Sequence, residues 1–174
     1  MSKPFVFKAR LKVADLFHHA NHIEVFTAAV AKRETLEHFL LRILGFSALS
    51  YNQRTFLNQK SDKSYPDVWC ENDEQKIVLA LYVSELDISE INRLCKLYDR
   101  LLILTIEGER WYDEISPQLI QHHNISIFTL KASFLEDLKT NLTNSMHWDI
   151  LIEQNSMSVS DKSGYYQTEV KQLC

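Results

Sequence analysis

Glycine, proline and cysteine are all scarce in this chain, with three of each among 174 residues. No segment is rich enough in Gly, Pro or Ser to act as a linker, so the sequence predicts a single domain over residues 1–174. The three cysteines are odd in number, far apart and without a Cys-x-x-Cys pair. They are therefore expected to be reduced thiols and not a zinc or redox site.

Long apolar runs and an excess of positive charge are also missing. No segment approaches the roughly 20 consecutive apolar residues of a membrane span, and Lys8, Arg10 and Lys12 interrupt any apolar run that a signal peptide would need. These features predict a cytoplasmic protein without membrane association. The formal net charge of -4 gives no overall attraction to phosphate. Binding to nucleic acid would need a local basic patch.

The N-terminal part of the chain is patterned for strands and then for a helix. Apolar and basic residues alternate over 5–13, and 23–30 is a second strand, which predicts a hairpin. From Glu34 the apolar spacing becomes helical, and this helix is expected to end around residues 45–50. A short strand at 53–57 and a polar loop at 58–65 are expected to follow.

The rest of the chain alternates strands and helices. Strands are predicted at 68–71, 77–83, 101–106 and 125–130, helices at 87–99 and near 110–121, and a short final helix around Phe134. This alternation implies crossover connections and a parallel portion of the sheet. The tail from 146 to 173 predicts a β-hairpin with a turn at 161–164. The expected class is α/β (α+β), a mixed sheet flanked by helices with β-hairpins at both termini.

Two carboxylates, Asp67 and Glu34, are candidates for a metal site. Asp67 follows Pro66 directly before a predicted strand, and Glu34 lies at the start of the first helix. Mg²⁺ prefers oxygen ligands and is usually held by one or two carboxylates with water and substrate phosphate. Each carboxylate also has a plainer interpretation: Asp67 as a turn residue after proline, and Glu34 as a first-turn complement to the helix dipole.

Four motifs, in order along the chain, resemble the YaeQ family of bacterial proteins. They are Phe7-Lys8-Ala9-Arg10-Leu11-Lys12-Val13-Ala14-Asp15-Leu16, Glu34-Thr35 before Leu40-Leu41-Arg42-Ile43-Leu44, Pro66-Asp67-Val68-Trp69 leading into Asn72-Asp73, and Ser158-Val159-Ser160-Asp161-Lys162. The resemblance covers nearly the whole chain. It implies a restriction-endonuclease-like PD-(D/E)XK core, in which such carboxylates hold a divalent metal that polarises a phosphate.

The sequence departs from that family where the metal site is expected. Ala80-Leu81-Tyr82-Val83-Ser84 stands where the family carries Trp-Ile-Glu-Leu/Val-Gly, so Tyr82 replaces the expected metal-binding Glu and Ser84 replaces the Gly. A phenol with a pKa of about 10 does not replace a carboxylate as a magnesium ligand near neutral pH. The family's basic pair in the next helix corresponds to Asn92 and Arg93. Arg93 holds its proton too tightly to act as a general base, although it can contact phosphate.

Two further groups of residues complete the candidate sites. Glu85 is a substitute ligand only if the strand ends or bulges at Ser84, because residues three apart on a strand point to opposite sides. Arg93, Lys96 and Arg100 fall at i, i+3 and i+7 and predict one basic stripe that could meet phosphates or form a solvated helix face.

Three functions remain open on the sequence alone. The first is a protein with a degenerate metal site and a binding role whose partner is unknown. The second is a weak or altered nuclease using Mg²⁺ or Mn²⁺, with Glu34, Asp67 and Glu85 as ligands and Arg93 on the scissile phosphate. The third is a non-catalytic DNA-binding module that uses Arg93, Lys96 and Arg100.

Overall fold

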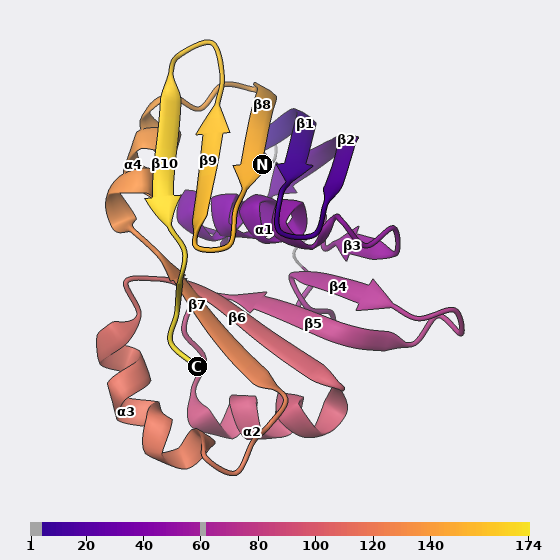
Figure 1. Cartoon of the computed structure of the whole chain (residues 1–174), viewed down its shortest axis with the longest axis vertical. Coiled ribbons are helices and arrows are strands. Elements are labelled where there is room, and N and C mark those ends of the chain that lie inside the picture. Colours follow the sequence, from indigo (N-terminus) through magenta and orange to yellow (C-terminus); the bar gives the residue numbers. More distant parts are fainter. Residues whose placement is uncertain (1–4, 60–61) are drawn as a thin grey trace.

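The computed structural model describes residues 5–59 and 62–174. In these residues the chain forms two mixed β-sheets and four helices, which confirms the expected α/β class (Figure 1). The helices are α1 (Leu36–Leu49), α2 (Ile88–Leu97), α3 (Glu109–Leu119) and α4 (Ala132–Thr140). The strands are β1 (Phe5–Asp15), β2 (Ala20–Val30), β3 (Thr55–Leu57), β4 (Val68–Glu71), β5 (Ile77–Val83), β6 (Arg100–Ile106), β7 (Ile125–Leu130), β8 (Ser145–Ile152), β9 (Ser156–Ser160), β10 (Tyr165–Glu169) and β11 (Lys171–Gln172).

The two ends of the chain meet in one five-stranded sheet, in the order β10-β9-β8-β1-β2. β1 and β2 form the expected N-terminal hairpin, with Phe5 opposite Val30 and Asp15 opposite Ala20. The C-terminal segment forms two successive hairpins, β8–β9 and β9–β10, and β8 pairs in parallel with β1. The N-terminal hairpin and the C-terminal hairpin with its turn at 161–164 were predicted from local patterns, whereas the β8–β9 hairpin was not. The union of these strands in one sheet depends on pairing across more than a hundred residues.

The six-stranded sheet has the order β11-β7-β6-β5-β4-β3. β5, β6 and β7 are parallel and are connected through α2 and α3, which confirms the predicted parallel portion. Apolar side chains project from both faces of this sheet, as expected for strands that are covered on both sides. Leu81 and Leu104 pack in the cluster that contains α1, whereas Ala80 and Ile103 pack in the cluster beneath α2 and α3.

Helix α1 lies between the two sheets (Figure 1). Thr35 caps its start, accepting a hydrogen bond from the His38 N–H at 3.1 Å. Its residues from Phe39 to Ser47 are buried all round, so it belongs to the core of the fold. Gly45 sets the distance to the six-stranded sheet, because a Cβ there would lie 3.0 Å from a methyl group of Leu81.

Helix α2 is shorter than the sequence predicted, and one expectation that depended on it is wrong. The helix ends at Leu97 and Arg100 begins β6, so Arg100 does not continue a helical stripe with Arg93 and Lys96. Alternation along β6 sends Leu101 and Ile103 toward α2 and Leu102 toward α1. Arg100 therefore points to the α1 side of the sheet, away from Arg93.

None of the helices in the described parts of the chain is long and apolar enough to cross a membrane.

Candidate functional site

Asp67 lies against the end of β5. Its side chain is nearly buried, and its Oδ2 accepts a hydrogen bond from the Val83 N–H at 2.9 Å. β4 and β5 are antiparallel with Val68 opposite Leu81, and extending this register by one residue places Asp67 opposite Tyr82. Both residues line one pocket of about 310 Å³, together with His38. The two positions that the resemblance places at a metal are therefore neighbours here.

Glu34 is held by a buried arginine. Arg42 is fully buried, and its Nε and Nη2 donate to Glu34 Oε1 and Oε2 at 2.6 and 2.8 Å. The Ala31 N–H donates to Oε2 at 3.0 Å. Such a two-pronged contact between guanidinium and carboxylate is among the strongest polar contacts in proteins. Both oxygens of Glu34 are occupied by protein donors.

Arg42 uses its remaining donors to join the two sheets. Its Nη1 donates to the Asn58 carbonyl oxygen, just after β3, and its Nη2 donates to the Ala29 carbonyl oxygen on β2 at 3.3 Å. A buried charge is tolerated only when it is paired and its donors are satisfied. The Glu34–Arg42 pair is thus a structural joint at the centre of the fold.

His38 connects the two carboxylates. Its Nδ1 lies 2.6 Å from Glu34 Oε1, and its Nε2 lies 3.5 Å from Asp67 Oδ1. About a quarter of its side chain is exposed to the groove, against 2% for Glu34 and 12% for Asp67. The accessible polar group between Glu34 and Asp67 is therefore an imidazole.

The two carboxylates have opposite pKa shifts. Burial by itself would raise the pKa of Glu34, but hydrogen bonds from His38, Arg42 and the Ala31 N–H outweigh it and lower the pKa to about 2. Burial raises the pKa of Asp67, because the Val83 N–H and the charges of His38 and Arg42 only partly offset it. Near neutral pH Glu34 is the ionised partner of Arg42, and Asp67 is the carboxyl that takes up a proton more readily as the pH falls.

Glu85 lies near Glu34 and His38 because the strand ends before Ser84, which is the condition that the sequence analysis set for it. β5 ends at Val83, and Ser84 has a φ of 75°, a left-handed conformation that favours glycine, the residue the family carries at this position. Glu85 lines a larger groove of about 640 Å³ together with Glu34, His38 and Lys63. It does not line the pocket of Asp67 and Tyr82. Within residues 5–59 and 62–174, no three or more His, Cys, Asp and Glu side chains are arranged to hold a metal ion.

Tyr82 fills the space where the resemblance expects a carboxylate. Its side chain lies on the α2 side of the sheet, with its ring centroid 6.5 Å from that of Tyr98. Burial, and then a hydrogen bond with Tyr98, raises its pKa further above the ordinary tyrosine value. The phenol is therefore neutral and packed against an aromatic neighbour.

The basic residues of α2 lie outside this pocket. Arg93 donates to both carboxylate oxygens of Glu90, at 2.9 and 2.5 Å, and its side chain is 59% exposed. Arg93 and Lys96 line a separate open groove on the helix surface. The structure thus brings Glu34 and Asp67 together through His38, leaves Glu85 at the rim, and separates Arg93, Lys96 and Arg100 from them.

Two residues of the site, His38 and Arg42, were not singled out from the sequence. Glu34, His38 and Arg42 follow one another at intervals of four, which places them on one side of a helix. That spacing was the available signal. It pointed to an ion-paired row, yet it could not show that the row is buried between two sheets.

The architecture, two mixed sheets around a central helix, matches solved structures of one class of protein. The YaeQ protein from Xanthomonas axonopodis pv. citri superposes with a TM-score of 0.89, covering 98% of each chain at 18% identity. The YaeQ protein from Pseudomonas syringae gives a TM-score of 0.90 at 20% identity, over 98% of this chain and 96% of that one.

Sequence comparison identifies the family. The family model described as YaeQ protein matches residues 1–170, so the chain belongs to the YaeQ family. The uncharacterized YaeQ proteins of Salmonella typhi and Escherichia coli (strain K12) are 23% and 22% identical to it over 162 residues. The alignments cover 91% of this chain and 90% of each relative. The resemblance found in the motifs is confirmed at the level of the family.

Proposed function

We propose that this chain is a non-catalytic binding protein on a PD-(D/E)XK-type core whose metal site has degenerated. The observation that carries the proposal is the complete engagement of Glu34, whose two oxygens accept hydrogen bonds from Arg42 and the Ala31 N–H and contact His38. A carboxylate neutralised by a buried guanidinium is a poor magnesium ligand, because the arginine already supplies the positive charge.

The neighbouring positions support the same proposal. Asp67 is oriented by the Val83 N–H and shares its pocket with Tyr82, a neutral phenol at the position of the family's Glu. A single carboxylate with a raised pKa is a weak anchor for a divalent ion, which is usually held by one or two carboxylates together with water and substrate phosphates. The groove is therefore better suited to hydrogen bonding than to metal-assisted hydrolysis.

The test is a titration with Mn²⁺ by calorimetry, run beside cleavage of supercoiled and single-stranded DNA with Mg²⁺ and then Mn²⁺. Wild type and Asp67→Ala come from the same purification scheme. We expect no saturable Mn²⁺ binding that depends on Asp67, and the same residual cleavage by both proteins. Cleavage by wild type that Asp67→Ala abolishes would establish the nuclease alternative, with Glu34, Asp67 and Glu85 as ligands.

The variant Tyr82→Glu sharpens the test. It places a carboxylate opposite Asp67, and two carboxylates facing each other across β4 and β5 form the beginning of an oxygen site. We expect this variant to gain Mn²⁺ affinity that is lost again in Tyr82→Glu/Asp67→Ala. Tyr82→Phe is the matched control, because it keeps the ring beside Tyr98 and adds no ligand.

A further inference from the structure

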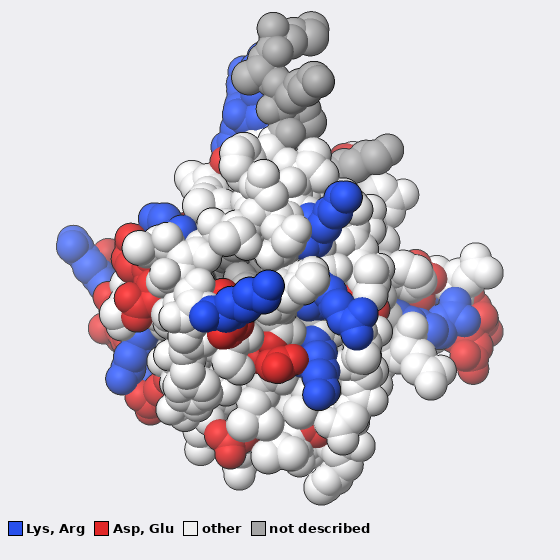
Figure 2. Space-filling model, turned by 90° about the horizontal axis from the view of Figure 1, so that it is seen from above, with Lys and Arg blue, Asp and Glu red and all other residues white. Residues whose placement is uncertain are grey.

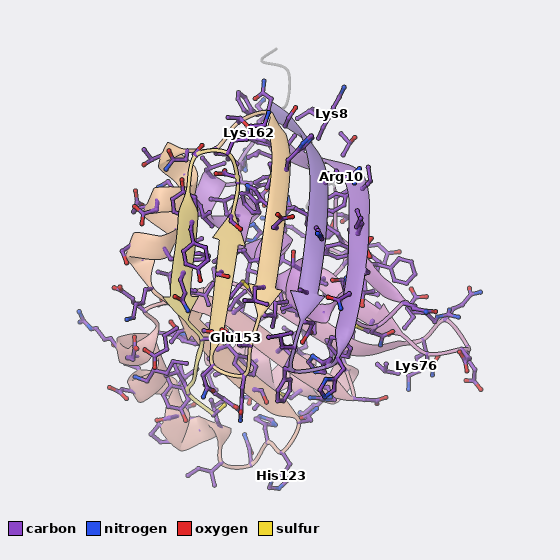
Figure 3. The ribbon with its side chains drawn as sticks, turned by 45° about the horizontal axis from the view of Figure 1, so that its top comes forward. Lys8, Arg10, Lys76, His123, Glu153 and Lys162 are labelled. Atoms are coloured by element: carbon purple, nitrogen blue, oxygen red, sulfur yellow. The ribbon has the colours of Figure 1, made fainter. Side chains whose placement is uncertain are left out.

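The outer face of the five-stranded sheet is open, and basic residues gather on it. The inner face packs through Phe7, Leu11 and Val13 into the cluster of α1 and α4, and both helices lie behind the sheet in Figure 3. The outward residues of the central strands are exposed. Antiparallel sheets commonly have one solvated face, so openness by itself is ordinary. The charge on this face is the unusual feature.

Three cations follow one another on β1. Lys8, Arg10 and Lys12 are exposed and alternate with buried Ala9 and Leu11, so all three point outward. Neighbouring cations are about 6.6 Å apart along the strand. Figure 3 shows Lys8 and Arg10 at the upper end of the sheet, with Lys162 of the β9–β10 turn nearby and Glu153 at the opposite end. We call Lys8, Arg10, Lys12 and Lys162 the β1 basic row.

The β1 basic row makes no ion pair with any residue in 5–59 or 62–174. The ion-paired lysines and arginines of that part of the chain all lie elsewhere: Arg42, Arg54, Arg93, Arg110, Lys131, Lys139 and Lys171. Asp149 is the register partner of Lys12 on β8, and Asp161 lies in the turn beside Lys162. These two carboxylates offset part of the positive charge of the row. The row remains cationic, although the chain has a net charge of -4.

Protection of a sheet edge does not explain the row. Lysines on edge strands discourage pairing with other chains, but β1 lies between β8 and β2. The edge strand β2 instead exposes Ile23 and Val25, by 51% and 72%. Lys8, Arg10 and Lys12 project from the same face of β1, so their positive charges act together on an anion that approaches this face.

The surface is shaped to receive an extended ligand. A shallow groove of about 400 Å³ runs across β1, β8 and the β9–β10 turn, lined by Arg10, Lys12, His147, Asp149 and Lys162 among others. Tyr165 of β10 is 62% exposed and, by its register with Ser160, sits at the same end of the sheet. Viewed from above, Figure 2 shows Lys and Arg side chains near the middle of the surface with Asp and Glu side chains between them.

We propose that the outer face of the five-stranded sheet binds the phosphate backbone of a single-stranded nucleic acid through the β1 basic row, with Tyr165 stacking on a base. An open sheet face with cations and an exposed aromatic ring is a known way of binding single strands. A second copy of this chain is a poor occupant, because two cationic faces would meet. Among the described residues, no helix projects from this face to enter the major groove of a duplex.

The test uses fluorescence anisotropy of labelled oligo(dT) and oligo(U) with the full chain at several salt concentrations. Contacts of Lys8, Arg10 and Lys12 with one phosphate each contribute about -2 to the slope of log affinity against log salt, which is roughly a 16-fold loss between 50 and 200 mM salt. Lys8→Gln/Arg10→Gln/Lys12→Gln should abolish measurable binding at the higher salt. These side chains point to solvent, and thermal unfolding of the variant verifies that it folds.

The matched control is Arg93→Gln/Lys96→Gln/Arg100→Gln, which removes the same charge from the other half of the molecule. This control should bind like wild type. Tyr165→Ala should weaken binding about fivefold or more without changing the salt slope, because stacking releases no counterions.

Four results would overturn the proposal: no oligonucleotide binding by wild type, unchanged binding by the β1 variant, equal loss in the α2 control, or duplex bound as tightly as single strand. A stronger β1-dependent affinity for poly-glutamate or anionic vesicles would also overturn it, by assigning the surface to another class of partner. The proposal is separate from the metal site. Asp67→Ala should bind oligonucleotides like wild type, so each proposal can fail alone.

Discussion

The two sheets of this protein contain similar numbers of strands but differ in what covers them. In the six-stranded sheet, β5 and β6 are apolar on both faces, and α1 lies on one side with α2 and α3 on the other. In the five-stranded sheet, β1 alternates buried apolar residues with exposed cations, and one face stays open. The site around Glu34, His38 and Asp67 lies beside the covered sheet, and the surface proposed to bind nucleic acid is the exposed face of the open sheet.

The largest loss of stability is expected at the Glu34–Arg42 pair, where the two sheets are joined. Arg42→Ala leaves the buried Glu34 without its counterion and removes the contacts to Ala29 and Asn58, so we expect a loss of about 3–5 kcal/mol in the free energy of unfolding. Urea denaturation measures it. The control Arg42→Met/Glu34→Leu removes both charges and should lose less than the single variant. A single variant as stable as wild type would mean that the joint is unimportant.

Replacing an isoleucine by alanine should cost more stability in the covered sheet than in the open sheet. Ile103 on β6 is fully buried, and Ile103→Ala should cost about 3 kcal/mol through lost burial and a cavity. Ile23 on β2 is 51% exposed, and Ile23→Ala should cost less than about 1 kcal/mol. Thermal or urea unfolding of both variants tests the contrast. Equal losses would show that the outer face of the open sheet is covered in solution.

Acid should weaken the joint in a defined pH window. The folded pKa of Glu34 is lowered from 4.5 to about 2, so its stabilising contribution is complete above pH 4.5 and is lost as the pH falls toward 2. The amount is on the order of 3 kcal/mol. Asp67, with a raised pKa, has the opposite sign, because its protonation favours the folded state.

Unfolding free energies measured at a series of pH values test this expectation, with Glu34→Gln as the comparison. The difference between the two proteins should shrink as the pH falls through the window. A constant difference would contradict the assignment of the shift to Glu34.

The smallest expected effect is a gain in stability from a substitution at the end of β5. Ser84 adopts a φ of 75°, and glycine reaches this conformation without the steric cost of a Cβ, so Ser84→Gly should stabilise the fold by about 0.5–1 kcal/mol. Ser84→Ala is the control, since alanine keeps the Cβ and should give no gain. If both variants behave alike in thermal unfolding, the backbone at Ser84 is not strained.

Local patterns predicted the elements of both sheets well. The strands 68–71, 77–83 and 125–130 were predicted with the bounds that the structure has, because short apolar runs between polar turns leave little freedom. The helix at 87–99 was predicted two residues too long at its C-terminal end, and the basic stripe was extended by helical spacing to Arg100, which lies beyond that helix and begins β6. Helical periodicity continues past a helix end, so spacing alone did not exclude Arg100.

The candidate site was predicted in part. Asp67, Glu34 and the altered position 82 came from motifs, and the structure brings the first two together through His38. The engagement of Glu34 by Arg42 was not predicted, although their spacing was visible. Whether a charged pair on a helix is solvated or buried depends on what packs over it.

The amino-acid sequence by itself determined the class of fold, the family and the two kinds of strand, since each follows from periodicity or from motifs of nearby residues. The tertiary structure alone decided that the two ends of the chain share a sheet, that Arg42 is buried against Glu34, and that Arg93 and Arg100 lie on opposite sides of the six-stranded sheet. These features depend on contacts between residues far apart in the chain. Such contacts form only when the whole core is assembled, and no local pattern contains them.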